Sequence, residues 1–405
     1  MTDFSTEYFT MNEEQAKEYA IKRLNYFQPD AELSCKEIGD GNLNYVFRIV
    51  DHKHKDSIIL KQAGPVARIS DEFKVSPDRN RIESDILKIQ YQYVPEHTPK
   101  TYQYDPIMNC FAMEDLSDHE IMRNALVKHQ VFPDFADHIT TFMANTLLLT
   151  SDVVMNHKEK KELVKTFINP ELCEISEDLV YTEPFYDCER NEVFPATRPF
   201  IEKEIWQDEQ LQLETAKLKF DFMTKAQSLI HGDLHTGSIF IKEDSTKVID
   251  PEFAFYGPAG YDIGNLIANL IFAYANGKAE IEDEKERHVF TNYLLTTIKD
   301  VIDLFKEKFN RIWSQSEIEQ VATYKGFQAA YLDSILADTA AVAGLELCRR
   351  IIGLAQVIDI TSIEDEAARQ QAEERCLRAA KQFILQRETF KDGEDFVALV
   401  KSSFQ

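Results

Sequence analysis

The sequence predicts an α+β protein of two lobes, a small antiparallel-sheet lobe followed by a large, mainly helical one. The first third contains short runs rich in β-branched and aromatic residues, separated by turn formers, which is the pattern of strands. After Leu116, apolar residues recur at the spacing of helices instead. The length of 405 residues allows one large two-lobed enzyme. We therefore expect an N-terminal lobe over 1–113, a hinge over 114–117 and a C-terminal lobe over 118–405.

The N-terminal lobe should begin with an amphipathic helix over 13–24 and contain a second helix over 76–90. Ser76 is the expected N-cap of the second helix, with Pro77 at its first position. The strands expected in this lobe cover 33–38, 46–50, 57–61, 102–104 and 107–113.

The C-terminal lobe shows helical spacing of apolar residues over 135–147 and 211–229, and again in most of the chain after Gly260. A short strand pair is expected over 239–241 and 247–249. The segment 176–199 holds three prolines and is predicted to be irregular.

The balance of charge restricts the kinds of partner. There are 45 Lys and Arg against 70 Asp and Glu, which gives a formal net charge of −25. Binding to nucleic acid or to an anionic membrane needs a basic surface, so we expect neither partner.

Residues 1–15 carry no Lys or Arg, and the longest apolar stretch, 266–275, is too short for a membrane span. None of the six cysteines forms a C-x-x-C pair, and a cytoplasmic protein is expected.

Three acidic motifs in the C-terminal lobe indicate phosphoryl transfer. The first reads His-Gly-Asp-Leu-His-Thr-Gly-Ser over 231–238, the second is Asp-Pro-Glu over 250–252, and the third contains Asp262. Phosphoryl transfer needs a carboxylate that orients the attacking hydroxyl, together with Mg²⁺ that neutralises phosphate oxygens. In an extended chain Asp250 and Glu252 project to the same side, so both could face one metal cluster. Asp262 is expected to be a buried structural brace.

The histidines of the first motif have a spacing that could suggest zinc. His231 and His235 are four residues apart, but Gly232 has a low helix propensity and disfavours a continuous helix between them. The zinc-binding motif H-E-x-x-H is also absent. We interpret both as histidines that stabilise the loop.

Together with the glycine-containing segment over 38–47, these motifs resemble the aminoglycoside phosphotransferase and choline kinase branch of the protein-kinase-like fold. Within that branch they are most similar to the 5-methylthioribose kinase family. The resemblance extends over about 38–350. It implies a two-lobed kinase that uses ATP and Mg²⁺ to phosphorylate the anomeric 1-hydroxyl of 5-methylthioribose, a step of methionine salvage. It also implies a homodimer.

The N-terminal lobe supplies the expected ATP site. Gly39 and Gly41 lie in a hairpin-like connection that would let backbone N–H groups approach a phosphate. Asn44 stands where a protein-kinase loop has a third glycine, and the resemblance places it in the ATP site. Lys61, at the end of a strand, suits pairing with the α- and β-phosphates, and Glu83 is its expected ion-pair partner.

The resemblance assigns further ATP contacts to the hinge, where backbone groups of Glu114, Asp115 and Leu116 would hold adenine. Asp250 and Glu252 complete the ATP-binding set and are the expected metal ligands. Ser238 departs from the broader superfamily, in which Asn ligates the second metal. A hydroxyl is a weaker ligand, so coordination is expected to shift toward Asp250 and Glu252, with Ser238 as a third candidate ligand.

Asp233 is the predicted catalytic residue. It should accept a hydrogen bond from the substrate hydroxyl and position that hydroxyl for in-line attack on the γ-phosphate. By resemblance, the neighbouring arginines Arg349 and Arg350 contact the sugar and help to neutralise the transferring phosphate.

Two other functions stay open at this level. The chain could phosphorylate another small alcohol, such as choline, homoserine or an aminoglycoside, although the paired arginines disfavour a cationic acceptor. It could also be a nucleotide-binding regulator without catalysis, because Ser238 departs from the broad pattern. Retention of Lys61, Asp233, Asp250 and Glu252 argues against the regulator.

Overall fold

The computed structural model describes residues 3–38, 44–64 and 76–405, and the chain divides into two compact units. The first unit contains 1–119 together with 247–254, and the second contains 120–246 and 255–405. The segment with Asp250 and Glu252 therefore belongs to the first unit, although it follows more than a hundred residues of the second. Gly39 and Gly41 lie outside the described residues. Residues 114–117 fall near the end of the first segment, and their role as a hinge stays a prediction.

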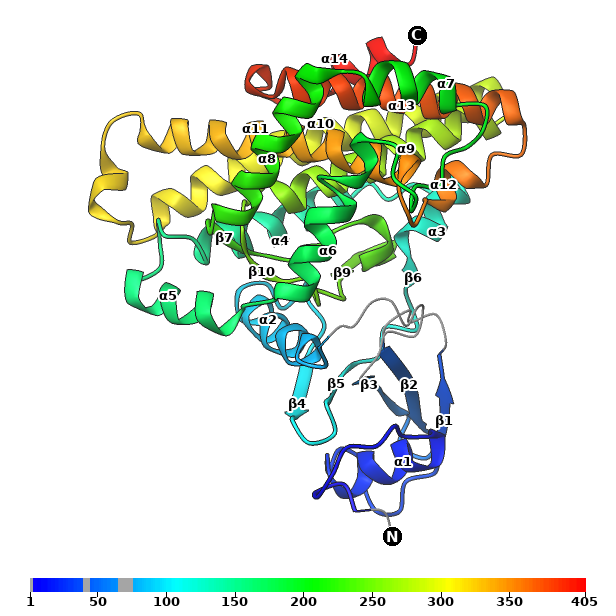
Figure 1. The fold of residues 1–405 in the computed structure, drawn as a ribbon. Coiled ribbons are helices and arrows are strands. Elements are labelled where there is room, and N and C mark those ends of the chain that lie inside the picture. Colours follow the sequence, from blue (N-terminus) through cyan, green and yellow to red (C-terminus); the bar gives the residue numbers. More distant parts are fainter. Residues whose placement is uncertain (1–2, 39–43, 65–75) are drawn as a thin grey trace. The chain divides into compact units, whose positions relative to one another are not determined.

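The first unit is built on a five-stranded antiparallel sheet with the strand order β1-β2-β3-β5-β4 (Figure 1). The elements of this sheet and its two helices are α1 (Glu13–Lys22), β1 (Leu33–Glu37), β2 (Asn44–Asp51), β3 (Asp56–Ala63), α2 (Arg79–Tyr93), β4 (Thr101–Asp105) and β5 (Cys110–Glu114). Leu60 is fully buried in the core that α1 covers. Because neighbouring side chains on a strand point to opposite faces, Lys61 points to the other face of β3. On α2, Leu87 packs against Phe111, and Glu83 lies one turn before it on the same helix face.

The second unit is mainly helical and also contains two small sheets, β10-β7 and β6-β8-β9 (Figure 1). Its strands are β6 (Glu120–Ile121), β7 (Ser228–Ile230), β8 (Ile239–Lys242), β9 (Ser245–Val248), which ends in the first unit, and β10 (Phe255–Gly257). Its α-helices are α3 (Met122–Val127), α4 (Phe135–Leu149), α5 (His157–Thr166), α6 (Pro170–Leu179), α7 (Arg198–Ile201), α8 (Glu209–Thr224), α9 (Gly260–Glu280), α10 (Glu284–Gln315), α11 (Phe327–Ile352), α12 (Ile358–Thr361), α13 (Glu366–Leu385) and α14 (Gly393–Ser403). Short 3₁₀ or π turns are η1 (Glu183–Phe185), η2 (Glu202–Trp206), η3 (Thr236–Ser238), η4 (Gln320–Thr323) and η5 (Arg387–Thr389).

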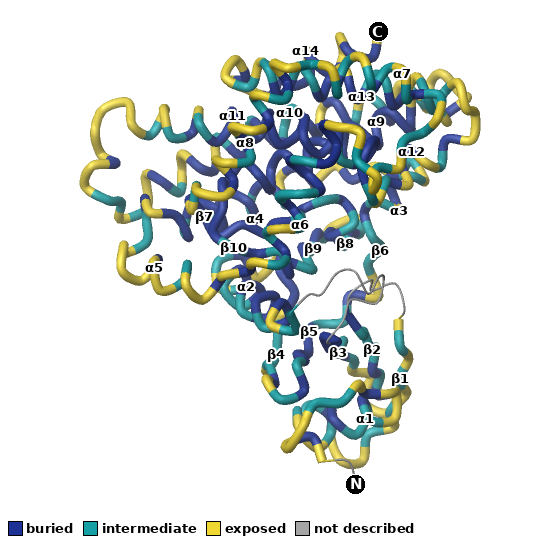
Figure 2. The backbone as a smooth tube through the Cα atoms, viewed as in Figure 1, coloured by how far each residue is buried: buried dark blue, intermediate teal, exposed yellow. Residues whose placement is uncertain are grey.

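Helix α9 is the centre of the second unit. It is buried along almost its whole length, as its dark tube in Figure 2 shows. Gly260 and Gly264, one turn apart, lie directly against α11: a Cβ at Gly264 would come within 2.6 Å of the backbone oxygen of Thr339. The absence of side chains at these two positions lets α9 and α11 approach closely. This packing sets α11, which carries Arg349 and Arg350, against the helix that follows the 231–238 motif in the sequence.

The α+β architecture predicted from the sequence is confirmed, whereas several element boundaries were wrong. Helix α2 begins at Arg79 and not at Pro77, because Ser76 and Pro77 form a turn in which the Ser76 hydroxyl accepts a hydrogen bond from the N–H of Asp78 at 3.2 Å. The strand expected over 107–113 begins only at Cys110, since Asp105 caps a turn before it through the N–H of Ile107.

The segment expected to be irregular over 176–199 begins inside α6 and includes η1. Within the described residues, no helix combines the length and apolar character needed to cross a membrane.

Candidate active site

The first unit places Lys61 among three carboxylates. The Lys61 ammonium lies 2.8 Å from one Glu83 oxygen and 2.7 Å from the other, and it also forms an ion pair with Asp250. Lys61, on β3, and Glu83, on α2, are almost fully buried, whereas the Asp250 side chain is 43% exposed. The predicted ion pair between Lys61 and Glu83 is therefore confirmed. Asp250 meets them from a distant part of the sequence.

The backbone at Asp250 differs from the extended chain that the sequence predicted. Its φ of 66° lies in the left-handed region, which non-glycine residues seldom adopt. The chain turns there, directly after β9. Asp250, Glu252 and Glu83 nevertheless each offer a carboxylate oxygen within 4.8 Å of the other two. A turn, and not strand alternation, brings the two motif acids together with the helix residue. Strained backbone of this kind is common where a side chain has to be aimed.

Asn44 and Arg79 hold Glu252 in place. The Asn44 amide donates to a Glu252 oxygen at 3.2 Å and accepts from the Arg79 guanidinium at 3.0 Å. Arg79 itself lies 3.5 Å from Glu252 and is one of the largest fully buried side chains. Asn44, predicted in the ATP site, thus contacts a predicted metal ligand through its side chain. Arg79 was noticed in the sequence beside Glu83, four residues before it, but no role in the site was predicted for it.

Burial is the main cause of the raised pKa values of the two glutamates in this cluster. Burial, aided by Asp250, raises the pKa of Glu252 to about 7, and burial raises the pKa of Glu83 to about 8. Burial alone would lower the pKa of Lys61, but Asp250, Glu83 and Glu252 raise it well above its usual range. The cluster holds more negative than positive charge in a buried place. Hard carboxylate oxygens in this arrangement fit Mg²⁺, and a bound cation would remove the excess negative charge.

The predicted hinge residues have specific partners in the first unit. The Asp115 carboxylate is bound by Arg48 at 2.7 Å and by the N–H of Ser117 at 3.0 Å. These hydrogen bonds, with one from Ser57, outweigh burial and lower its pKa. Glu114 accepts from the N–H of Lys100 at 3.0 Å, and Leu116 is buried. The Asp115 side chain therefore fixes the backbone here, which is compatible with the predicted role of the backbone groups.

The second unit presents Asp233 on a loop between β7 and η3. Gly232 has a φ of 82°, a left-handed conformation that glycine adopts without strain. The two oxygens of Asp262, at the start of α9, accept the N–H groups of His231 at 2.7 Å and Gly232 at 3.0 Å. The prediction that Asp262 is a structural brace is confirmed. His231 also acts within the loop, because its Nδ1 accepts the N–H of Asp233 at 3.3 Å.

Asp233 is surrounded by cationic groups and one imidazole. Arg349 lies 3.8 Å and Arg350 3.7 Å from its Oδ1, and His235 lies 3.3 Å from its Oδ2. The buried Glu346 binds both arginines, at 3.1 and 2.7 Å, and so fixes them one turn along α11. The Asp233 side chain stays 22% exposed. The structure thus brings Arg349 and Arg350 to the residue predicted to be catalytic.

The surroundings of Asp233 keep it ionised. Burial would raise its pKa, but His235, Arg349 and Arg350 hold the pKa well below its usual range. Burial lowers the pKa of His235, so the ring is neutral near pH 7. Its Nδ1 accepts the N–H of Gly237 at 3.0 Å, which places the ring proton on the Nε2 that faces Asp233. His235 therefore stabilises the loop, as predicted, and in addition contacts the Asp233 carboxylate.

Ser238 serves the same loop. Its buried hydroxyl donates to the carbonyl oxygen of Asp233 at 3.1 Å and lies 3.3 Å from Nδ1 of His235. Ser238 belongs to the second unit, whereas Asp250 and Glu252 belong to the first. Its role as a metal ligand stays a prediction.

Two further charged residues near Asp233 were not found from the sequence. Arg123 comes from α3 and Asp359 from α12, and both are buried or nearly so. Neither belongs to a motif, so the sequence offered no signal for them. Both act electrostatically on the cluster: Arg123 interacts with Asp233 and Arg350, and Arg350 also interacts with Asp359.

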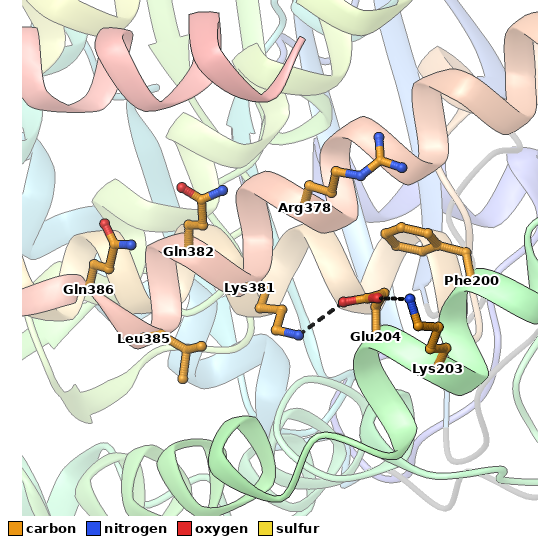
Figure 3. Close-up of a pocket in the computed structure, with 8 residues that line it drawn as sticks. All are labelled: Phe200, Lys203, Glu204, Arg378, Lys381, Gln382, Leu385 and Gln386. Atoms are coloured by element: carbon orange, nitrogen blue, oxygen red, sulfur yellow. Dashed lines mark hydrogen bonds and ion pairs between the residues drawn. The ribbon is translucent and has the colours of Figure 1, made fainter. Parts of the chain in front are cut away.

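A surface pocket of the second unit lies elsewhere, between α7, η2 and α13 (Figure 3). None of its lining residues is a predicted site residue. Its charged groups are largely paired with one another: Glu204 binds Lys203 at 2.9 Å and Lys381 at 3.2 Å. The Arg378 guanidinium stacks over the Phe200 ring at 4.9 Å. With its charges neutralised internally, this pocket offers no obvious group for phosphoryl transfer.

Comparison with known proteins gives consistent matches. A model of the phosphotransferase enzyme family matches residues 181–288. The chain is 42% identical to a methylthioribose kinase of Geobacillus kaustophilus, over 98% of this chain and 98% of that protein. It is 41% identical to a methylthioribose kinase of Bacillus pumilus, over 100% and 99% of the two chains. Among solved structures, a choline kinase from Cryptosporidium parvum is 15% identical, covers 90% of this chain and 93% of its own, and has a TM-score of 0.48.

Proposed function

Because this chain belongs to the methylthioribose kinase family, we propose that it transfers the γ-phosphate of ATP to the anomeric 1-hydroxyl of 5-methylthioribose. The chain is an ATP-dependent small-molecule kinase with a protein-kinase-like fold. The observation that carries the finer proposal is the placement of Asp233 beside Arg349 and Arg350, in a chain 42% identical over its length to a methylthioribose kinase.

The first unit supplies the groups for ATP. We assign Lys61 to the α- and β-phosphates, with Glu83 keeping its ammonium oriented. Asp250 and Glu252 would hold Mg²⁺, with Asn44 and Arg79 fixing Glu252. The bound cation would neutralise charge on the phosphate oxygens. The hinge residues Glu114, Asp115 and Leu116 would hold adenine through their backbone.

The second unit supplies the groups for the acceptor. The ionised Asp233 accepts a hydrogen bond from the 1-hydroxyl and orients its oxygen toward the γ-phosphorus. The new bond joins that oxygen to phosphorus while the bond to the bridging oxygen of ADP breaks, and the hydroxyl proton passes to Asp233. Arg349 and Arg350 stabilise the negative charge of the transferring group. Ser238 keeps the backbone of the loop in place and is also our third candidate metal ligand.

The same family relationship supports a homodimer that works in the cytoplasm and uses Mg²⁺. The step would belong to methionine salvage. Light scattering of the purified protein would give its mass in solution, and about twice 46.8 kDa is expected for the dimer. A mass equal to that of one chain would contradict it.

The substrate is tested by ADP release measured with a panel of acceptors. The panel contains 5-methylthioribose, choline, homoserine and an aminoglycoside, each with ATP and Mg²⁺. We expect turnover with 5-methylthioribose alone, and loss of that turnover in Asp233→Ala with ATP binding retained. Turnover with another acceptor in preference, or full activity of Asp233→Ala, would contradict the proposal. If none of the acceptors in the panel led to ADP release, the result would support the regulator considered from the sequence.

A further inference from the structure

Asp359 is a buried carboxylate that no neighbour satisfies. Its side chain is 1% exposed, and neither of its oxygens accepts a hydrogen bond from another described residue. The nearest cation, Arg123, keeps its Nε 3.9 Å away, too far for a hydrogen bond. That Nε also has no hydrogen-bond partner among the described residues. Buried polar groups are normally paired, so two facing groups left unpaired indicate a place for a ligand.

The Arg123 side chain and the Asp359 backbone are each held in place by other contacts. The Arg123 Nη2 donates to Asn269 Oδ1 at 3.0 Å, and the same oxygen accepts from the Thr236 hydroxyl at 3.3 Å. Asn276 of α9 donates to the backbone oxygen of Asp359 at 2.8 Å and fixes α12.

The pair belongs to the surroundings of Asp233. Thr236, which shares Asn269 with Arg123, lies in η3 directly after the Asp233 loop. An added Cβ at Gly237 would come within 3.1 Å of Arg123, so this guanidinium lies against the loop itself. Helix α3 packs against η3, α9 and α12. Asp359 and Arg123 are therefore next to the acceptor groups and outside the set that the motifs predicted.

The chemistry of the pair fits a vicinal diol. A hydroxyl can donate one hydrogen bond and accept others, so it can bridge an unpaired carboxylate and an unpaired guanidinium N–H. Two carboxylate oxygens can accept from two neighbouring hydroxyls, as an acid does with a ribose in nucleotide sites. Around Asp233 the three arginines Arg123, Arg349 and Arg350 balance the carboxylates of Asp233, Glu346 and Asp359. A balanced cluster suits a neutral, hydroxylated acceptor better than an amine.

We propose that Asp359 and Arg123 form the subsite that binds the vicinal 2- and 3-hydroxyls of the acceptor sugar, a role that rests on the proposed function. Asp359 accepts a hydrogen bond from each of the two hydroxyls, and the Nε–H of Arg123 donates to one of the two hydroxyl oxygens. With the 2- and 3-hydroxyls held there, the 1-hydroxyl is left for Asp233. The subsite makes the kinase selective for a ribose-type diol.

The test combines Asp359→Asn with substrates that lack one hydroxyl. For the wild type, 2-deoxy and 3-deoxy analogues of 5-methylthioribose should each lower kcat/KM about 100-fold or more, because a lost hydroxyl leaves buried groups unpaired. Asp359→Asn should lower kcat/KM for the full sugar by a similar factor. In the Asp359→Asn variant, removing one hydroxyl from the sugar should lower kcat/KM by less than about tenfold, because the carboxylate that binds the hydroxyl is already absent. Arg123→Lys keeps the positive charge but not the planar guanidinium. It should likewise reduce the difference in kcat/KM between the full sugar and its deoxy analogues.

The control is Glu364→Gln, which removes an exposed carboxylate five residues further along. It should keep the wild-type penalty for both analogues, and KM for ATP should be unchanged in all three variants. The subsite would be overturned if Asp359→Asn lost as much kcat/KM with the deoxy analogues as the wild type does. It would also be overturned if the kinetics of this variant with the full sugar were unchanged. Wild-type turnover of another ribose-type sugar in place of 5-methylthioribose would defeat the proposed function but not the subsite, which would then be tested with that sugar's deoxy forms. Turnover only with acceptors that lack a vicinal diol would overturn both.

Discussion

The two charged regions of this molecule contain the same residue types in opposite balance. In the first unit, Glu83, Asp250 and Glu252 outnumber Lys61 and Arg79, and burial among like charges raises the pKa of Glu252 to about 7 and that of Glu83 to about 8. In the second unit, arginines match the acids. Carboxylates therefore carry excess negative charge in the first region, whereas in the second their charge is balanced and Asp233 is ionised.

Asp233 shows what the second balance achieves. A carboxylate at that degree of burial would bind a proton more tightly without its partners, but His235, Arg349 and Arg350 lower its pKa. It can therefore accept the hydrogen bond of a hydroxyl across the neutral pH range. In the acid-rich cluster of the first unit, Lys61, Arg79 and a bound metal would have to lower the pKa values of the carboxylates.

The largest expected effect separates the two regions by function. Asp233→Asn should lower kcat by about 10²–10⁴-fold while the affinity for Mg²⁺ and ATP stays within about twofold, because it removes the base alone. Asp250→Asn should instead weaken Mg²⁺-dependent nucleotide binding. Titration calorimetry and steady-state kinetics on both variants measure the separation. If both variants lost nucleotide binding equally, the division into two regions would be wrong.

A second prediction concerns stability and sharpens the contrast within the second unit. Burial raises the pKa of Asp359 from its ordinary value of 3.8 to about 6, so its ionisation opposes folding. The penalty is absent below about pH 4, grows as the pH rises from about 4 to about 6, and stays constant at about 3 kcal/mol above that. Asp359→Asn should therefore have an unfolding free energy equal to or above that of the wild type at pH 8, with the difference disappearing toward pH 4. Denaturant titrations at both pH values measure it.

A purely structural ion pair between Asp359 and Arg123 would give the reverse outcome. Removing one partner of a buried pair leaves the other charge uncompensated and destabilises the fold. A clear loss of stability in Asp359→Asn at pH 8 would thus identify a brace and not a group kept for substrate.

The paired arginines are expected to have an intermediate effect. Arg349→Lys and Arg350→Lys should each lower kcat/KM about 10–100-fold, because a lysine keeps the charge but loses the planar fork that Glu346 orients. Arg387→Lys is a control, since that arginine pairs with Glu214 outside the site. Wild-type kinetics in both site variants would remove the pair from the acceptor site.

The pH dependence of sugar use provides a smaller effect. Asp359 should be protonated below about pH 6, and Arg123 and Arg350 are the charged groups that face it. At saturating ATP, kcat/KM for the sugar should fall up to about tenfold per pH unit as the pH drops through 6. Asp359→Asn should lack this decline. A decline that persists in the variant would have to come from another group.

The smallest predicted effect is that of His235. His235→Asn should lower kcat about tenfold or less with little change in KM, because the carboxylate of Asp233 keeps its arginines but loses one orienting contact. Stopped-flow measurement of the chemical step would detect it. A loss as large as that of Asp233→Asn would show that the imidazole takes part in the proton transfer directly.

The predictable part of the site is the part carried by motifs. The sequence anticipated the Lys61–Glu83 ion pair, the brace of Asp262 and the protein-kinase-like fold, because local spacing and family resemblance both constrain them. Arg123 and Asp359 were missed because each stands alone on a short helix. Only the packing of α9 against α3 and α12 brings them to the loop.

Errors in the sequence analysis came from local backbone geometry. The turn at Asp250, with its positive φ, could not be read from Asp-Pro-Glu, which is compatible with an extended chain. The start of α2 was displaced because Ser76 uses its hydroxyl in a turn before the helix. The burial of Arg79 depends on Asn44 and Glu252, residues that lie far from it in the sequence. In each case a tertiary contact or turn overrides the local propensity.

The oxygen that receives the phosphate gives the most direct test of the role proposed for Asp233. Phosphorus-31 NMR of the reaction of the wild-type protein with ATP, Mg²⁺ and 5-methylthioribose should show one sugar phosphate whose phosphorus couples to the anomeric proton. The same signal should be absent from Asp233→Asn. A phosphate on the 2- or 3-oxygen, or the 1-phosphate formed at the wild-type rate by Asp233→Asn, would contradict the assignment of Asp233 to the 1-hydroxyl.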